Sequence, residues 1–237
     1  MKALILVAGM GTRLGQYTTN IPKSLLEIKG KPILGHIIDR IIINNINEFV
    51  IVVGFQKEKI INYLKNNYPE INFTFVENNI YEKTNTLYSM WLAKDYISDE
   101  FLYLHGDLLF HKNILRDLLD SKHQNGAIVE PHKESMGVYG FDNIITRFSK
   151  KKDSMGKALG IYKFSKVATE NVFAEAERII NKGEITLFQS EAINPTILNH
   201  RMNLVSTNGM SWIEVDEPED LREAEKILDK IEREESS

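Results

Sequence analysis

Residues 2–14 read KALILVAGMGTRL, a nearly continuous apolar run that passes directly into a glycine-rich turn. The run from Lys2 to Ala8 does not alternate apolar with polar residues, which is typical of a strand covered on both faces of a parallel sheet. Gly9 and Gly11 remove side chains where a backbone must pass close to a ligand. Because the N–H groups of a turn after a strand can point at one anion, the stretch predicts an α/β protein with an anion site at the end of its first strand.

Two cations follow this turn. Arg13 offers a forked guanidinium suited to phosphate oxygens, and Lys23, directly after the stiff Pro22, adds a point charge. The plainer interpretation is a glycine turn with two solvated cations. Two familiar phosphate-binding loops do not fit: Leu14 stands where a dinucleotide fingerprint needs a third glycine, and the Gly-Lys-Ser/Thr of a Walker loop is absent.

The rest of the first half alternates buried-strand patterns with helical spacing. Further strands are predicted at 48–53, 72–77, 101–105 and 127–130, and helices at 32–44, 57–67, 86–96 and 113–122. This alternation predicts an α/β fold with a doubly wound, mostly parallel sheet.

The rhythm changes after about residue 130. The patterns predict a hairpin at 137–148 that turns at Asp142 and Asn143, strands at 158–164, 204–206 and 211–215, and helices at 167–181 and 218–235. These elements predict a smaller β-rich lid or acceptor region. We expect one domain over residues 1–237, with a first half at 1–130 and a second half at 131–237.

Composition excludes several classes of protein. The 237 residues are 43% apolar and hold no cysteine, so disulfides, thiolate nucleophiles and zinc–thiolate sites are excluded, and a reducing cytoplasmic location is expected. No apolar run is long enough for a membrane span, and no signal peptide pattern is present. The net charge of -4 argues against nucleic-acid binding. The chain is thus expected to have neither a membrane nor a nucleic acid as partner.

The string LVAGMGTRL at residues 6–14, followed by IPKSLLEIKGKPIL at residues 21–34, resembles the sugar nucleotidyltransferase superfamily. The resemblance implies a Rossmann-like nucleotidyltransferase fold with a nucleotide-binding first half and an acceptor-side second half. It implies that the backbone at Ala8, Gly9 and Gly11 meets the nucleotide, and that Arg13 and Lys23 are catalytic cations on its phosphates. The chain departs from the pattern at 15–17, where many members have a proline and this chain has none.

Two aspartates follow strand patterns and could hold a metal ion. Asp107 comes after the strand at 101–105 and Gly106, and Asp216 comes after the strand at 211–215. Carboxylates at two strand ends could hold one Mg²⁺ against triphosphate oxygens. Each could instead cap a turn or helix, but both segments resemble the metal-binding segments of the superfamily. Glu214 would share a strand face with Asp216 and either assist it or face solvent.

The segment Asn85-Thr86-Leu87-Tyr88-Ser89 bears on the nucleotide. Asn85 and Ser89 lie one helical turn apart, and an asparagine can offer a donor and an acceptor to a base edge; Asn85 is equally a good helix N-cap. The pattern resembles the cytidylyltransferase branch that includes phosphocholine and inositol-phosphate cytidylyltransferases, which implies CTP as the nucleotide.

The acceptor is less constrained by the sequence. Candidate acceptor-binding residues are Tyr162, Phe188, Glu191 and Trp212, because aromatic rings with an acid could hold an amine by cation–π contact; the rings could equally pack the lid. His105 is expected to be a strand residue rather than a catalyst. The run 150–152 of three lysines is expected to be a solvated loop, or else to attract an anionic acceptor.

Together these features predict a Mg²⁺-dependent cytidylyltransferase that transfers CMP from CTP to a small phosphorylated or phosphonate acceptor and releases pyrophosphate. One alternative is a sugar-1-phosphate nucleotidyltransferase that uses UTP or dTTP. Another is a nucleotide-binding regulatory protein without turnover, although such a protein would be expected to lose its metal carboxylates. The oligomeric state stays open, and a homodimer is compatible with the sequence.

Overall fold

A central sheet runs through the computed structural model, which describes residues 1–131, 137–149 and 154–236. Over these residues the sheet has nine strands. In spatial order they are β5 (Asn72–Glu77), β4 (Glu48–Val53), β1 (Lys2–Val7), β6 (Phe101–His105), β11 (Gly156–Phe164), β8 (Gly126–Pro131), β12 (Met202–Ser206), β10 (Ile144–Ser149) and β9 (Gly137–Phe141). Among the described strands, only β10 and β11 run against the common direction. The α/β fold with a mostly parallel sheet is confirmed.

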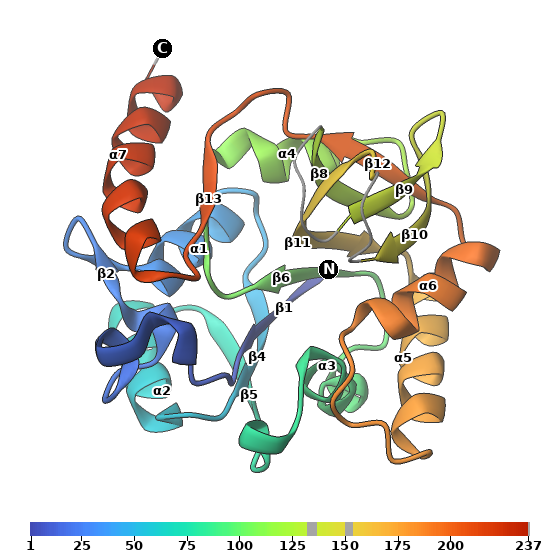
Figure 1. Ribbon diagram of the computed structural model, residues 1–237, viewed down its shortest axis with the longest axis horizontal. Helices are drawn as coiled ribbons and strands as arrows, with labels where there is room; N and C mark the ends of the chain where they lie inside the picture. The colour runs from blue at the N-terminus through green and yellow to red at the C-terminus, as the bar shows by residue number, and fades with distance from the viewer. Residues whose placement is uncertain (132–136, 150–153, 237) are drawn as a thin grey trace.

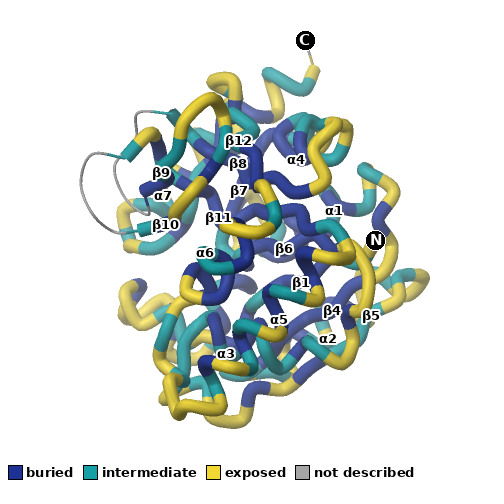
Figure 2. Tube along the Cα trace, turned by 90° about the vertical axis from the view of Figure 1, so that its right-hand side faces the viewer, coloured by how far each residue is buried: buried dark blue, intermediate teal, exposed yellow. Residues whose placement is uncertain are grey.

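Helices cover both faces of this sheet, as Figure 1 shows. One face packs against α1 (Ile33–Ile42), α2 (Lys57–Asn67), α4 (Lys112–Asp120) and α7 (Pro218–Glu235). The other packs against α3 (Thr86–Leu92), α5 (Lys166–Ile180) and α6 (Ser190–Asn199). Strand β1 lies between both layers, since Ile5 and Leu4 are fully buried in opposite clusters. The trace through the central strands is accordingly buried, with exposure at the outer turns (Figure 2). Over the described residues, no helix is long and apolar enough to cross a membrane.

Several elements differ from the prediction. The helix expected at 86–96 ends at Leu92 and is followed by a 3-10 turn at Lys94–Tyr96. Helix α6, with Pro195 inside it, was not predicted. Short elements were also missed: β2 (Glu27–Ile28), β3 (Lys31–Pro32), β7 (Leu108–Phe110), and 3-10 turns at Thr12–Thr18, Lys23–Leu25 and Tyr81–Lys83. The predicted hairpin turn is confirmed, because both Asp142 and Asn143 have positive φ, as a two-residue type I′ turn requires.

Strand β7 matters for the site because it pairs with β13 (Trp212–Glu214), near the end of the chain. Glu214 lies opposite Leu108, and the Val215 amide donates to the Asp107 carbonyl at 2.9 Å. A capping box between Glu217 and Asp220 then starts α7 directly afterwards. This ladder brings the segment after β6 and the segment after β13 side by side, although more than a hundred residues separate them along the chain.

Candidate active site

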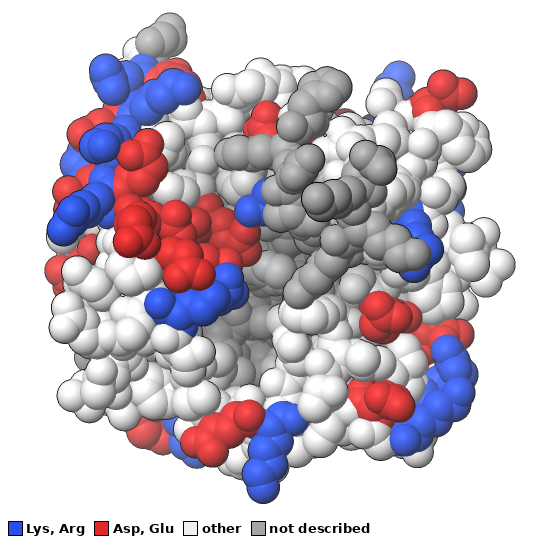
Figure 3. Space-filling view, in the orientation of Figure 1, with Lys and Arg blue, Asp and Glu red and all other residues white. Residues whose placement is uncertain are grey.

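A cleft of about 710 Å³ opens at the carboxyl ends of β1 and β6. Such an edge of a parallel sheet is where ligands bind in open α/β folds. The cleft is lined by most of the residues singled out from the sequence: Ala8, Gly9, Gly11, Arg13, Lys23, Asn85, Ser89, Asp107, Tyr162, Phe188 and Asp216. Acidic side chains gather over the end of β13 and the start of α7, with basic side chains beside them (Figure 3). The structure therefore brings together residues from both halves of the chain.

The two glycines of the N-terminal loop have different structural reasons. Gly11 has φ +66°, and a Cβ there would lie 2.8 Å from the Lys23 Cβ. Its carbonyl accepts hydrogen bonds from the Leu14 amide and the Thr18 hydroxyl. A Cβ on Gly9, by contrast, would meet no atom within 4 Å. Gly11 is needed by the fold of the loop, whereas Gly9 leaves space in the cleft.

Lys23 lies between two carboxylates at the floor of the cleft. Its Nζ is 2.6 Å from Asp107 Oδ2 and 2.5 Å from Asp216 Oδ1, and Arg13 Nη1 lies 2.8 Å from the other oxygen of Asp216. Burial lowers the pKa of Lys23, but the charges of Asp107 and Asp216 outweigh burial and raise it overall. Burial alone would raise the pKa of Asp216, but the charges and hydrogen bonds of Lys23 and Arg13 outweigh burial and lower this pKa overall. Lys23 and Asp216 are therefore both charged at neutral pH.

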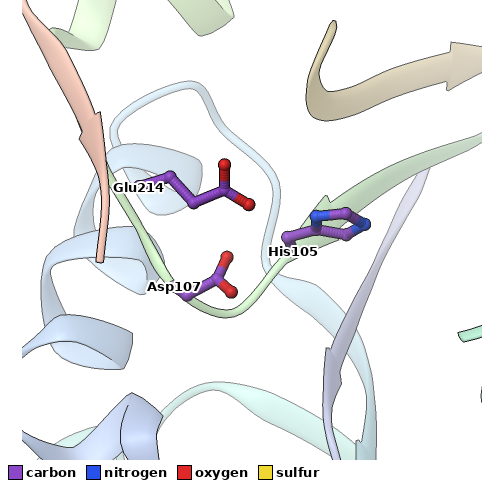
Figure 4. A group of neighbouring side chains, drawn as sticks. All are labelled: His105, Asp107 and Glu214. Carbon is purple, nitrogen blue, oxygen red and sulfur yellow. The ribbon is translucent and has the colours of Figure 1, made fainter. Parts of the chain in front are cut away.

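A second group of metal-ligating side chains shares Asp107. One ligand atom each from His105, Asp107 and Glu214 lies within 4.8 Å of the others. Figure 4 shows the two carboxylates facing a common space, with the imidazole of His105 alongside. Asp107 Oδ1 is buried without a hydrogen-bond partner, which is a position that a cation would satisfy. Carboxylate oxygens converging from two strand ends thus fit a hard divalent cation.

His105 takes part in a polar network above these carboxylates. Gln189 Nε2 lies 3.2 Å from His105 Nε2, so the amide donates and the imidazole accepts. Thr86 Oγ1 donates to the side-chain Oε1 of Gln189. Gly160, at φ +78°, leaves room for the imidazole ring itself, since a Cβ there would lie 2.5 Å from His105 Nδ1. His105 ends strand β6, as the sequence predicts, yet it also lines the cleft.

Asn85 and Ser89 lie at the start of α3 and line the cleft. Asn85 is the N-cap, and its side-chain oxygen accepts from the Thr86 amide at 2.8 Å. Asn78 was not chosen from the sequence, although it is only 1% exposed and lines the cleft. Its Nδ2 donates to Thr84 Oγ1 and Ser89 Oγ. The signal that could have identified it is an asparagine at the end of β5 shortly before the Asn85 to Ser89 motif.

The acceptor-side candidates divide into two groups. Tyr162 and Phe188 line the cleft. Trp212 does not line it: the ring is buried and its Nε1 donates to Glu130 Oε2 at 2.7 Å. Glu191 is exposed on α6 and is not among the cleft residues either. Helix α6 thus directs Glu191 to solvent, away from Tyr162 and Phe188, and the acceptor role of these four residues stays a prediction. The lysine run at 150–152 lies outside the described residues.

Comparisons with known proteins show which family the chain belongs to. The bifunctional protein GlmU of Methanococcus maripaludis is 37% identical over 243 residues, which cover 98% of this chain and 55% of that protein. The chain thus spans about half the length of these curated relatives. Choline-phosphate cytidylyltransferase of Streptococcus pneumoniae is 28% identical over 229 residues, covering 96% of this chain and 98% of that protein.

A UTP–glucose-1-phosphate uridylyltransferase, AglF of Haloferax volcanii, is equally similar, at 28% identity over 245 residues and 96% of both chains. The solved structure of CTP:phosphocholine cytidylyltransferase from Streptococcus pneumoniae superposes with a TM-score of 0.81 at 27% identity, covering 96% of this chain and 98% of that one. The model of the nucleotidyl transferase family matches residues 2–230. The resemblance found in the N-terminal loop is confirmed, and the chain belongs to the nucleotidyl transferase family.

Proposed function

We propose that this nucleotidyltransferase is a Mg²⁺-dependent cytidylyltransferase, which transfers CMP from CTP to a small phosphorylated or phosphonate acceptor. One observation carries the proposal: the glycine loop, two cations and two strand-end carboxylates converge on one cleft. In this proposal residues 1–130 bind mainly the nucleotide and residues 131–237 complete the acceptor side.

The nucleotide has a binding partner for each of its parts. The backbone at Ala8, Gly9 and Gly11 meets the nucleotide, and Asn85 and Ser89 face the base. Arg13 and Lys23 hold phosphate oxygens, the first as a fork and the second as a point charge. Since both cations already lie beside Asp216, they need only exchange that carboxylate for phosphate oxygens.

Nucleotidyltransferases generally use a divalent metal. We assign Asp107 and Asp216 as its ligands here, because both carboxylates converge on one cation, the ammonium of Lys23. A bound Mg²⁺ would neutralise charge on the triphosphate and orient its α-phosphate.

The transfer itself needs little from side-chain acid–base chemistry. An oxygen of the acceptor phosphate is already an anion near neutral pH. It attacks the α-phosphorus and forms a new P–O bond, while the bond from the α-phosphorus to the α,β-bridging oxygen breaks. Pyrophosphate leaves with that electron pair. The chain contributes by positioning the two phosphates and stabilising their charge through Arg13 and Lys23.

The rival assignment is UTP or dTTP with a sugar 1-phosphate, and the similarity to AglF motivates it. Cytosine differs from uracil and thymine by an amino donor in place of a carbonyl acceptor. We favour cytosine because of the Asn85 to Ser89 motif and the match to the cytidylyltransferase structure.

Pyrophosphate release should therefore be fastest with CTP. The measurement compares CTP, UTP, dTTP, ATP and GTP at equal concentration, with a panel of phosphorylated amines, polyols and sugars as acceptors. Preference for UTP or dTTP would favour the rival. No release with any nucleotide, from protein that still binds CTP, would favour a binding protein without turnover.

The glycine loop gives a second test. Gly9→Ala should leave the free energy of unfolding nearly unchanged, since its Cβ meets nothing, but should weaken CTP binding because the methyl group enters the cleft. Gly11→Ala should lower the free energy of unfolding by about 1–2 kcal/mol, because alanine disfavours its left-handed backbone. Urea unfolding and calorimetric CTP binding separate the two effects. Equal loss of affinity without loss of stability in both variants would contradict these roles.

A further inference from the structure

Lys157 is a cation inside the acceptor side of the cleft, and the sequence prediction did not include it. It lies at the start of β11 and lines the cleft. Its Nζ is 2.7 Å from Glu214 Oε2 and 5.2 Å from the ring centroid of Trp212. The side chains of Lys157 and Glu214 are only 19% and 22% exposed. Lys157 and Glu214 thus form an ion pair beside the Trp212 ring, at what we call the acceptor wall of the cleft, and the chain's own ammonium group already contacts this carboxylate and this ring.

This occupation decides what the wall can bind. An amine or quaternary ammonium group needs an aromatic face or a carboxylate to compensate its charge. The Trp212 ring and Glu214 both face Lys157, and Asp107 and Asp216 face the ammonium of Lys23. A cationic acceptor would add a like charge beside Lys157 in a partly desolvated site, where repulsion is only weakly screened.

Two further polar side chains among the described residues that line the cleft, Gln189 and Tyr162, are uncharged. Gln189 is 3% exposed and lines the cleft, and it connects Thr86 with His105. Burial raises the pKa of Tyr162 well above its ordinary value, so its phenol stays a protonated donor. Amide and hydroxyl groups of this kind exchange hydrogen bonds with the hydroxyl groups of a ligand.

We propose that Lys157 is a specificity-determining residue, which makes the enzyme select a hydroxylated phosphate ester, such as a polyol phosphate or sugar phosphate, over a phosphorylated amine. In this arrangement Lys157 repels ammonium groups, while Gln189 and Tyr162 face the hydroxyl groups of the acceptor. The proposal rests on the transferase function proposed above.

The test compares two kinds of acceptor in the wild type and in Lys157→Met. We measure kcat/KM with CTP for phosphocholine, glycerol 3-phosphate and glucose 1-phosphate, the last two distinguishing a polyol from a sugar. The wild type should prefer a hydroxylated acceptor. Lys157→Met should shift the ratio toward phosphocholine by roughly tenfold or more, because the like charge is removed and the Glu214 carboxylate, which lines the cleft, becomes available to the ammonium group of the acceptor.

Lys94→Met is the matched control. Lys94 also pairs with a glutamate, Glu177, and its Nζ also lies 5.2 Å from a tryptophan centroid, that of Trp91, but it does not line the cleft. It should leave the acceptor ratio unchanged. A wild-type preference for phosphocholine, or an unchanged ratio in Lys157→Met, would overturn the proposal.

A binding readout keeps this proposal separate from the proposed transfer reaction. Calorimetric titration of the same three acceptors into the protein requires no turnover. If no nucleotide is turned over, the proposed transfer reaction is contradicted. The relative affinities of the wild type and of Lys157→Met for phosphocholine and glycerol 3-phosphate still decide the role of Lys157.

Discussion

Asp107→Asn should reduce turnover roughly a thousandfold while the protein stays folded. The amide keeps the shape of the side chain but removes the negative charge of the Asp107 carboxylate. In the wild type, Oδ2 of this carboxylate faces Lys23, and Oδ1 is buried without a hydrogen-bond partner. Losing a ligand of a catalytic metal removes several kcal/mol of charge stabilisation, and about 4 kcal/mol corresponds to a factor of a thousand in rate. The measurement is pyrophosphate release at saturating CTP, with circular dichroism and thermal unfolding to verify the fold.

Asp229→Asn serves as its control. Asp229 also forms an ion pair with a lysine, since its Oδ1 lies 2.6 Å from Lys29 Nζ. It lies on α7, however, and does not line the cleft. We expect wild-type turnover from this variant. If Asp107→Asn retained the rate of Asp229→Asn, the metal assignment at the end of β6 would be wrong.

The first half of the fold could be predicted because its signals are local. Strand β1 reads as an unbroken apolar run, and the structure buries its residues in two opposite clusters. A strand that contacts helices on both faces leaves this mark in the sequence regardless of the rest of the chain. The hairpin turn at Asp142 and Asn143 is local in the same way, since the residue types that tolerate positive φ are few.

The acceptor side could not be predicted, because it depends on contacts between distant segments. Lys157 and Glu214 are 57 residues apart, and nothing near Lys157 indicates that β13 will pair with β7 and place Glu214 beside it. Helix α6 was missed because Pro195 interrupts its pattern, so the sequence did not indicate that Glu191 lies on an exposed helix face. Aromatic residues near an acid in the sequence do not reveal which ring is already covered by a cation.

The cluster around Lys23 also sets how the protein responds to pH. Burial alone would raise the pKa of Asp216, but Lys23 and Arg13 lower it overall in the folded protein. The stabilising contribution of Asp216 is therefore present above the ordinary aspartate pKa and is lost as pH falls through the lowered value. The pKa of Lys23 is raised, so its contribution is present below the ordinary lysine value and is lost as pH rises through the raised one. The charged cluster is thus stabilising across the neutral range.

Lys23→Met should change three measurable properties at once. CTP affinity should fall roughly tenfold to a hundredfold, the value of one charged hydrogen bond to phosphate. Removing the ammonium leaves Asp107 and Asp216 as neighbouring like charges, which raises the pKa of at least one of them. The variant should then gain stability as pH falls from 7 toward 5, where the wild type does not. Urea unfolding at both pH values measures this difference.

The third property separates a phosphate ligand from a merely structural lysine. In the wild type the ammonium of Lys23 competes with any divalent cation for the two carboxylates, so Mn²⁺ alone should bind weakly, and Lys23→Met should bind it more tightly while binding CTP less tightly. Lys29→Met is the control, because Lys29 Nζ also lies between two carboxylates, 2.6 Å from Asp229 and 2.6 Å from Glu232, outside the cleft. Calorimetry with Mn²⁺ and with CTP tests both effects. If Lys23 had only a structural role, Lys23→Met would lower the free energy of unfolding, as Lys29→Met could, and would leave the affinities for Mn²⁺ and CTP unchanged. That result would contradict the role assigned to Lys23.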